Sequence, residues 1–238
     1  MLKCRVIPIL TFNGFALVKT KEFAQNPRMV GNPVQAARVY NHRNVDELVF
    51  LDIYASDKNR KINLQIARMV IDECFMPVAI GGGIKSNQDI QDLLEIGADK
   101  VVLKTIAIEN PEFINEAATV FGNQCITLAV DAIQKEDGKY YLYNRLDKII
   151  PLFEFLEGIK SYNFGEIVLT SVNKDGLMNG FDIDLVKRVE SIIRVPIVAS
   201  GGAGSPEHVK ELFDNLLTKY LCLKWEDVKT EIIIEYLY

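Results

Sequence analysis

The 238-residue sequence predicts an α/β fold, a (β/α)8 TIM barrel built from two half-barrel repeats. Apolar segments of strand length alternate with segments of helical periodicity, which is typical of a parallel sheet covered by helices. An apolar run that ends in glycines is also written twice, at residues 77–86 and 196–205, and 196 − 77 is 119. Since twice 119 is 238, four βα units in each half account for the whole length.

The first half begins with a strand at residues 6–10, and a long connection at 11–32 follows it. Connections of this length in compact domains are usually functional. Asn32 and Pro33 are typical of an N-cap and a first helical position, and they predict a helix at 33–42. Apolar runs and helical spacing then predict strands at 48–53, 77–80 and 100–103, and helices at 61–74, 87–96 and 111–121.

The second half begins with an apolar strand at residues 125–130. Asp137 and Gly138, flanked by alternating polar and apolar residues, predict a hairpin at 133–143. The remaining patterns predict helices at 149–162, 182–193 and 207–216, strands at 167–171, 196–200 and 220–223, and a helical tail from 226. The total is eight strands and eight helices, and the repeat favours a barrel over the alternative, an open doubly wound sheet.

Composition supports one domain over residues 1–238, with half-barrels at about 1–119 and 120–238, because 49% of the residues are hydrophobic. The net charge of −5 argues against a nucleic-acid partner, which requires a basic surface. We expect no signal peptide and no membrane span, since no apolar run approaches about 18 residues. Scattered cysteines without metal-ligand spacing predict buried free thiols in a reducing, cytoplasmic protein with no metal and no cofactor: Cys4, Cys74, Cys125 and Cys222.

Both repeated segments are interpreted as a buried strand that ends in a tight turn at a helix N-terminus. Gly82 and Gly83 follow the first strand, and Gly201 and Gly202 follow the second. Backbone N–H groups of such turns bind phosphate. Two cradles in matching positions predict a ligand with a phosphate at each end.

Catalytic groups of such barrels lie at the carboxyl ends of the strands. Asp131 directly follows an apolar strand, where a partly desolvated carboxylate can act as a general acid or base; equally, it could only cap the next turn. Asp52 could instead hydrogen-bond a loop, and a solvated side chain is the simpler expectation for each lysine. The further candidates at this face are Thr11, Lys19, Asp52, Lys104, Thr105, Thr170, Asp175 and Gly176.

Several segments occur in the order of a known family, at residues 46–52, 80–86, 97–101, 121–125, 165–170, 175–176 and 199–204. Over about residues 1–213 the chain resembles the cyclase subunit of imidazole glycerol phosphate synthase, the HisF family. The resemblance implies a glutaminase partner (HisH-like) at the amino-terminal barrel face. It also implies that ammonia is used at the opposite face, on a substrate with two phosphates, in histidine biosynthesis.

The resemblance implies two catalytic aspartates, and only one is present. Asp131 matches the position after the fifth strand, whereas Thr11 stands where the family has the other aspartate. Lys104 replaces an asparagine beside Thr105, and Leu177 replaces a threonine. Bulky residues at 220–225 replace a small-residue turn, which predicts a shortened eighth βα unit and an incomplete phosphate site at Gly201 and Gly202.

These departures resemble a branch of the family that accompanies surface-polysaccharide genes. The branch implies delivery of ammonia to a sugar amidotransferase, with a phosphorylated small molecule or sugar nucleotide as acceptor and with weak or lost cyclase activity. The alternatives are a functional cyclase subunit in histidine biosynthesis, a non-catalytic conduit between two enzymes, and a HisA-like phosphosugar isomerase.

Four charged residues precede strands and therefore belong to the bottom rim of the barrel: Arg5, Glu47, Lys100 and Glu166. Plain stability of the bottom face is one explanation. Buried ion pairs are seldom retained for stability alone, and all four positions match the family's proposed ammonia gate. Asp99 matches a position on the family's glutaminase-facing surface.

Overall fold

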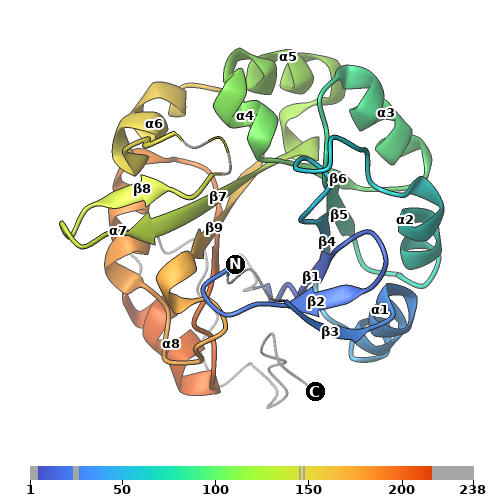
Figure 1. Cartoon of the computed structure of the whole chain (residues 1–238), viewed down its shortest axis with the longest axis horizontal. Helices are drawn as coiled ribbons and strands as arrows, with labels where there is room; N and C mark the ends of the chain where they lie inside the picture. Colours follow the sequence, from blue (N-terminus) through green and yellow to red (C-terminus); the bar gives the residue numbers. More distant parts are fainter. Residues whose placement is uncertain (1–4, 24–26, 145, 147, 216–238) are drawn as a thin grey trace.

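The computed structural model describes residues 5–23, 27–144, 146 and 148–215. In this part of the chain the α-helices form a ring around the strands, which lie inside it (Figure 1). A helix shell around a parallel sheet is the α/β barrel architecture that the sequence predicts.

The first half contains β1 (Ile9–Phe12), β2 (Leu17–Lys19), β3 (Arg28–Gly31), α1 (Pro33–His42), β4 (Leu48–Asp52), α2 (Leu64–Ile71), β5 (Val78–Gly81), α3 (Asn87–Glu95), β6 (Lys100–Leu103), α4 (Thr105–Glu109) and α5 (Glu112–Phe121). The second half contains a 3-10 turn (Asn123–Cys125), β7 (Ile126–Gln134), β8 (Tyr140–Leu142), α6 (Leu152–Ile159), β9 (Glu166–Ser171), a 3-10 turn (Val172–Lys174), α7 (Ile183–Ile192), β10 (Ile197–Ser200) and α8 (Pro206–Asn215).

Seven strands pair in parallel, in the order β1, β4, β5, β6, β7, β9 and β10. Because these strands all run in the same direction, their carboxyl ends lie at one end of the barrel and their starts at the other. The predicted strand at 220–223, the helical tail from 226 and the shortened eighth unit lie outside the described residues.

Element starts repeat at the interval found in the sequence. The pairs α1 and α6, α2 and α7, β5 and β10, and α3 and α8 each begin 119 residues apart, since 152 − 33, 183 − 64, 197 − 78 and 206 − 87 are all 119. These equal intervals support the interpretation of the chain as two half-barrels, which remains a prediction.

Three predicted segments differ from the structure. The first strand begins at Ile9, after Pro8, which has no N–H to donate to a ladder. The connection at 11–32 is not a loop throughout, because β2 pairs antiparallel with both β1 and β3. The predicted hairpin is confirmed as β7 and β8, but β7 continues to Gln134, so Asp131 lies within a strand and does not cap a turn.

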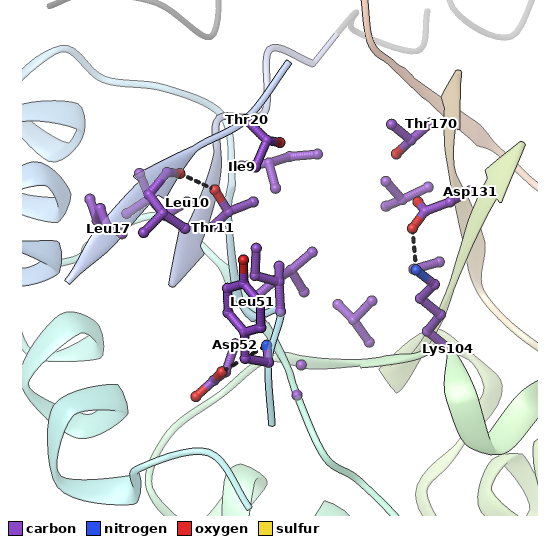
Figure 2. A pocket seen from close by; sticks show the side chains of 18 of the residues that line it. Ile9, Leu10, Thr11, Leu17, Thr20, Leu51, Asp52, Lys104, Asp131 and Thr170 are labelled. Atoms are coloured by element: carbon purple, nitrogen blue, oxygen red, sulfur yellow. Dashed lines mark hydrogen bonds and ion pairs between the residues drawn. The ribbon is translucent and has the colours of Figure 1, made fainter. Parts of the chain in front are cut away.

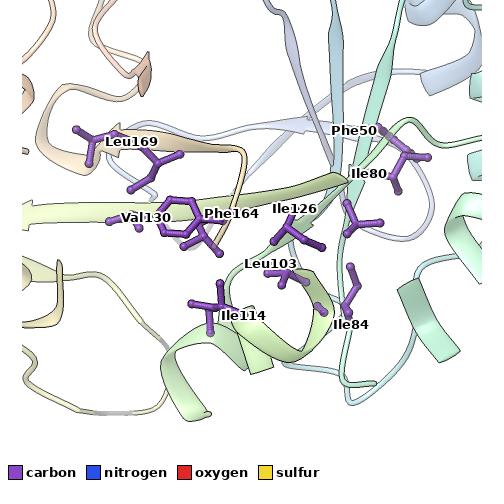
Figure 3. Close-up of a cluster of buried hydrophobic side chains, with 14 of the residues drawn as sticks. Phe50, Ile80, Ile84, Leu103, Ile114, Ile126, Val130, Phe164 and Leu169 are labelled. Atoms are coloured by element: carbon purple, nitrogen blue, oxygen red, sulfur yellow. The ribbon is translucent and has the colours of Figure 1, made fainter. Parts of the chain in front are cut away.

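The apolar core has two layers because residues alternate across the sheet. Phe50, Ile80, Leu103 and Ile126 are buried between the strands and the helices (Figure 3). Alternate residues form a smaller cluster of Val49, Ala79 and Val102, whose small side chains pack within the barrel.

The described residues contain no helix long and apolar enough to cross a membrane, and no group of three His, Cys, Asp or Glu side chains that could hold a metal ion. Cys74 and Cys125 are half-buried free thiols. Burial raises the pKa of Cys74 to about 11, so its thiol stays protonated at neutral pH.

Gly202 is required by packing. Its φ is +98°, and an added Cβ would lie 2.1 Å from the carbonyl oxygen of Gly180. We predict that Gly202→Ala lowers the free energy of unfolding by more than about 1 kcal/mol in chemical denaturation. Gly158→Ala is the control, because Gly158 lies in α6 with nothing within 4 Å, and it should leave stability equal or slightly higher. Equal stability of the two variants would contradict the packing argument.

Candidate functional site

A cavity of about 1060 Å³ opens at the carboxyl ends of the strands and reaches into the barrel (Figure 2). Most of the predicted site residues line it: Thr11, Lys19, Asp52, Gly82, Gly83, Lys104, Thr105, Asp131, Thr170 and Asp175. Gly176, Gly201 and Gly202 are not among the residues that line this cavity, and their role in binding phosphate remains a prediction. The barrel topology therefore gathers these residues, which are far apart in the sequence, around one space.

Thr11 supplies no carboxylate to this space. Its hydroxyl donates a hydrogen bond to the carbonyl oxygen of Val18, at 2.5 Å. That bond holds β1 against β2, so the hydroxyl proton is used within the hairpin. A threonine also cannot exchange a proton near neutral pH, so this position contributes no general acid or base.

Asp131 and Lys104 form an ion pair between β7 and the end of β6 (Figure 2). Asp131 is 8% exposed, and the Lys104 side chain is 33% exposed. The Lys104 ammonium also lies over two aromatic rings, 5.9 Å from the centroid of Phe23 and 5.7 Å from that of Tyr143. The two rings pack edge to face, with centroids 5.1 Å apart. Lys104 is therefore held by three side chains, which excludes the solvated lysine that was the simpler expectation.

Asp52 is engaged by Arg60, which was not predicted from the sequence. The guanidinium donates to both carboxylate oxygens, at 2.5 and 2.9 Å, and also to the carbonyl oxygen of Asn13, at 3.2 Å. This arrangement ties the end of β4 to the turn after β1. The loop-bonding alternative for Asp52 therefore describes its observed contacts, and nothing in the charge pattern around Arg60 indicated the pairing.

Asp175 is a buried carboxylate at the cavity wall, 7% exposed. Burial raises its pKa to about 6, and the negative charge of Asp131 adds to the effect. A long hydrogen bond from the Thr20 hydroxyl, at 3.4 Å, opposes the increase. Asp175 thus changes charge near pH 6, within the range where it could hold or release a proton.

The glycine turn after β5 has a packing reason of its own. Gly83 has a φ of +70°, and an added Cβ would lie 2.1 Å from the carbonyl oxygen of Arg60. The N-terminus of α3, expected to face an anion, is occupied by the chain itself, because Ser86 and Asp89 form a capping box there. Thr105 begins α4 and donates to the Ser56 hydroxyl at 3.3 Å. Phosphate binding by Gly82, Gly83 and Thr105 therefore remains a prediction.

The four charged residues at the strand starts form a closed ring, called here the charged ring. Arg5 pairs with Glu47 at 2.7 Å and with Glu166 at 2.9 Å. Lys100 pairs with the same two carboxylates, at 2.8 and 2.9 Å. Thr127 adds a hydrogen bond to Glu166 at 3.2 Å. The sequence placed these residues on one rim, and the structure brings all four into contact.

The neighbours of the charged ring fasten the strand starts. Asp99 is exposed, and its carboxylate accepts the backbone N–H of Val78 at 2.8 Å. Asp46 accepts the N–H of Val6 in the same way, at 2.9 Å. Asp99 therefore has a structural bond in addition to the partner-facing role predicted for it.

Comparisons with known proteins give consistent results. A family model described as histidine biosynthesis protein matches residues 5–222. The chain is 40% identical over 235 residues to the imidazole glycerol phosphate synthase subunit HisF of Exiguobacterium sp., covering 98% of this chain and 91% of that protein. It is 42% identical over 217 residues to the HisF subunit of Streptococcus mutans, covering 90% of this chain and 86% of that protein.

The raised pKa of Asp175 predicts a pH-dependent stability. A carboxylate with a folded pKa of about 6, against an ordinary value of 3.8, stabilises the fold when protonated, and this contribution is lost as pH rises through 6. Between pH 5 and pH 8 the stability changes mainly up to the folded pKa of about 6. The free energy of unfolding therefore falls by about 1.4 kcal/mol, which corresponds to about one pH unit. We therefore predict that Asp175→Asn gains this amount relative to the unchanged protein between these pH values, measured by urea denaturation. A pH-independent difference would show that Asp175 is not desolvated.

Glu166 in the charged ring predicts that stability depends on pH in the opposite direction. Burial alone would raise the pKa of Glu166, but hydrogen bonds from Arg5 and Lys100 outweigh it and lower the pKa below 4.5. Its stabilisation is present above pH 4.5 and is lost as pH falls through the folded pKa. Glu166→Gln should cost about 3 kcal/mol at pH 7, and less at pH 3, in the same denaturation assay.

The control for the charged ring is Glu157→Gln. Glu157 pairs with Lys160 at 2.6 Å, but both side chains are more than half exposed. Exposed pairs contribute little, so this variant should change stability only slightly at either pH. A loss at pH 7 as large as that of Glu166→Gln would show that burial of the ring does not set its strength.

Proposed function

The chain belongs to the HisF family of imidazole glycerol phosphate synthase subunits, and we propose that it carries ammonia from a glutaminase partner through the barrel to an acceptor in the cavity. The observation that carries this proposal is the charged ring at the strand starts, opposite the cavity at the strand ends. Ammonia is small and neutral, so opening of ion pairs in the ring would let it enter the barrel without a charge crossing the core.

The interior between the two ends supports this path. Val49, Ala79 and Val102 contribute small apolar side chains to the inner cluster. A neutral molecule loses less solvation free energy in such surroundings than an ammonium ion does. The barrel would thereby select ammonia over ammonium.

The names of the relatives favour the imidazole glycerol phosphate synthase reaction, and hence histidine biosynthesis, as the first candidate for the acceptor. They give no support to an isomerase of the HisA type. A second candidate is a sugar acceptor, with ammonia passed to a sugar amidotransferase. The comparisons do not support this candidate either, and what favours it is the altered chemistry of the cavity.

That chemistry differs from the two-aspartate cyclase at two points. Thr11 provides no carboxylate, and Lys104 neutralises Asp131. Asp175 is retained but is close enough to Asp131 for their charges to interact. We therefore propose that any cyclase activity is weak, because the loss of one acid–base group costs ~10²- to 10⁴-fold in rate.

The test is ammonia-dependent turnover of the ribulosyl substrate of the family by the purified chain, compared with the Streptococcus mutans relative. We predict a rate at least ~10²-fold below that of the relative, and a partial recovery in Thr11→Asp, which restores a carboxylate. Thr11→Ser is the matched control, because it keeps a hydroxyl near Val18 and should stay slow.

The outcomes separate the candidates. Turnover equal to that of the relative would make the chain a full cyclase and refute the predicted weakness. Weak turnover that rises in Thr11→Asp and disappears in Asp131→Asn supports the first candidate. No turnover in any variant would exclude the histidine-pathway substrate and favour the sugar acceptor.

A further inference from the structure

The carboxylate of Asp182 joins three elements of the second half-barrel. Both of its oxygens accept the hydroxyl of Tyr140 in β8, at 3.0 Å each. One oxygen also accepts the hydroxyl of Ser171 at the end of β9, at 3.1 Å. The other accepts the backbone N–H of Leu185 in α7, at 3.1 Å. These four residues are not among those that line the cavity, so the network ties β8, β9 and α7 together behind the cavity wall.

The side chain of Tyr140 is fixed in this position. It is 7% exposed, and its ring packs edge to face against Phe153, with centroids 6.0 Å apart. The guanidinium of Arg188 lies over both rings, 3.8 Å from the centroid of Phe153 and 5.7 Å from that of Tyr140. Burial raises the pKa of Tyr140, and the charge of Asp182 adds to the increase. The hydroxyl therefore keeps its proton at neutral pH and acts as a donor.

Ser171 connects this network to the cavity. Its carbonyl oxygen accepts the N–H of Asp175 at 3.0 Å, within the turn that brings Asp175 to the cavity wall. An added Cβ on Gly201 would lie 2.6 Å from the same carbonyl oxygen. A displacement of Ser171 would therefore move the Asp175 turn and press on the second glycine turn.

The other side of the network leads to Asp131. The hairpin of β7 and β8 extends away from the centre of the barrel (Figure 1), and within it the N–H of Tyr143 donates to the carbonyl oxygen of Asp131 at 2.7 Å. Asp131 also lies opposite Thr170 in the register of β7 and β9. The bond between Tyr140 and Asp182 therefore links the hairpin that carries one cavity carboxylate to the turn that carries the other.

The two carboxylates affect each other across the cavity. Burial and the charge of Asp131 raise the pKa of Asp175, and the Thr20 hydroxyl opposes the increase. Lys104 pairs with Asp131 from the end of β6, and the N–H of Glu22 donates to the carbonyl oxygen of Asp175 at 3.0 Å. The proton affinity of Asp175 thus depends on how closely its turn is held against β7.

We propose that Tyr140 is a positioning residue, which acts through Asp182 and Ser171 to hold the carboxyl group of Asp175 beside Asp131. The inference rests on the proposed function, because an acceptor in the cavity is what the two carboxyl groups would act on. Two carboxyl groups in different surroundings suit opposite roles, one accepting and one donating a proton. Without the Tyr140 hydroxyl, the turn moves away from β7 and water reaches Asp175.

The experiment follows the carboxyl carbons of the full chain, labelled with 13C at aspartate, by NMR during a pH titration. Asp175→Asn identifies the signal of Asp175. In the unchanged chain this signal should titrate with a midpoint of about 6. In Tyr140→Phe the midpoint should fall by about half a pH unit or more towards the ordinary value of 3.8, because the carboxyl group is better hydrated and farther from Asp131.

The matched control is Tyr141→Phe. Tyr141 is the next residue of β8, and its hydroxyl also donates to a carboxylate, that of Asp137 in the hairpin turn, at 2.8 Å. Loss of this bond should leave the Asp175 midpoint unchanged within about 0.2 pH unit. Thermal unfolding of each variant checks the fold, since a purely structural role would lower the melting temperature without moving the midpoint.

Ser171→Ala tests the route of the effect. It removes the hydroxyl bond to Asp182 and keeps the backbone contacts of Ser171. This variant should lower the Asp175 midpoint as Tyr140→Phe does. The double variant should lower it no further than the larger of the two single changes, because both act through one carboxylate.

Each outcome decides for or against the inference. An unchanged midpoint in folded Tyr140→Phe, an equal fall in Tyr141→Phe, or a midpoint near 3.8 in the unchanged chain would overturn it. If Tyr140→Phe does not fold, Ser171→Ala decides in the same way. The titration uses neither substrate nor glutaminase, so ammonia delivery is judged separately, by glutamine-dependent turnover with a glutaminase partner. Failure of that turnover alone would refute the proposed function and leave the positioning of Asp175 in place.

Discussion

The position of the strands in this barrel depends on the charged ring at their starts. Glu47, Lys100 and Glu166 lie at the starts of β4, β6 and β9, and Arg5 lies four residues before β1. The four side chains close into one cycle of ion pairs. Each carboxylate is at most 6% exposed, so removal of one partner leaves a buried charge uncompensated. The ring therefore fixes the strand starts relative to one another.

At the opposite end of the barrel, Thr11, Asp131 and Asp175 each have different surroundings. With Thr11 bonded inside its own hairpin, Asp131 has a lysine as its nearest charged neighbour. Phe23 and Tyr143 lie beside that lysine, whose side chain remains 33% exposed. Burial raises the pKa of Asp175 to about 6, and the negative charge of Asp131 adds to the increase. The two carboxylates at this end therefore differ, since Asp131 is paired with a cation and Asp175 is buried beside it.

Elements with a periodic or capped sequence pattern were predicted correctly from the sequence. Features that depend on contacts between distant residues were not. The helix at Pro33–His42 was predicted to the residue, because Asn32 and Pro33 mark its start. The hairpin of β2 and β3 was missed, because its short strands lack a clear alternation. Arg60, Thr20, Phe23 and Tyr143 were missed at the site because each acts through a partner distant in sequence.

By itself the sequence determined the barrel class, the interval of 119 residues and the rim on which each charged residue lies. These properties follow from periodicity and from the direction of parallel strands, which are local features of the chain. Only the tertiary structure decided that the four rim charges close into a ring and that Lys104 pairs with Asp131. Such contacts join residues up to 161 positions apart, as Arg5 and Glu166 are, and burial sets their strength.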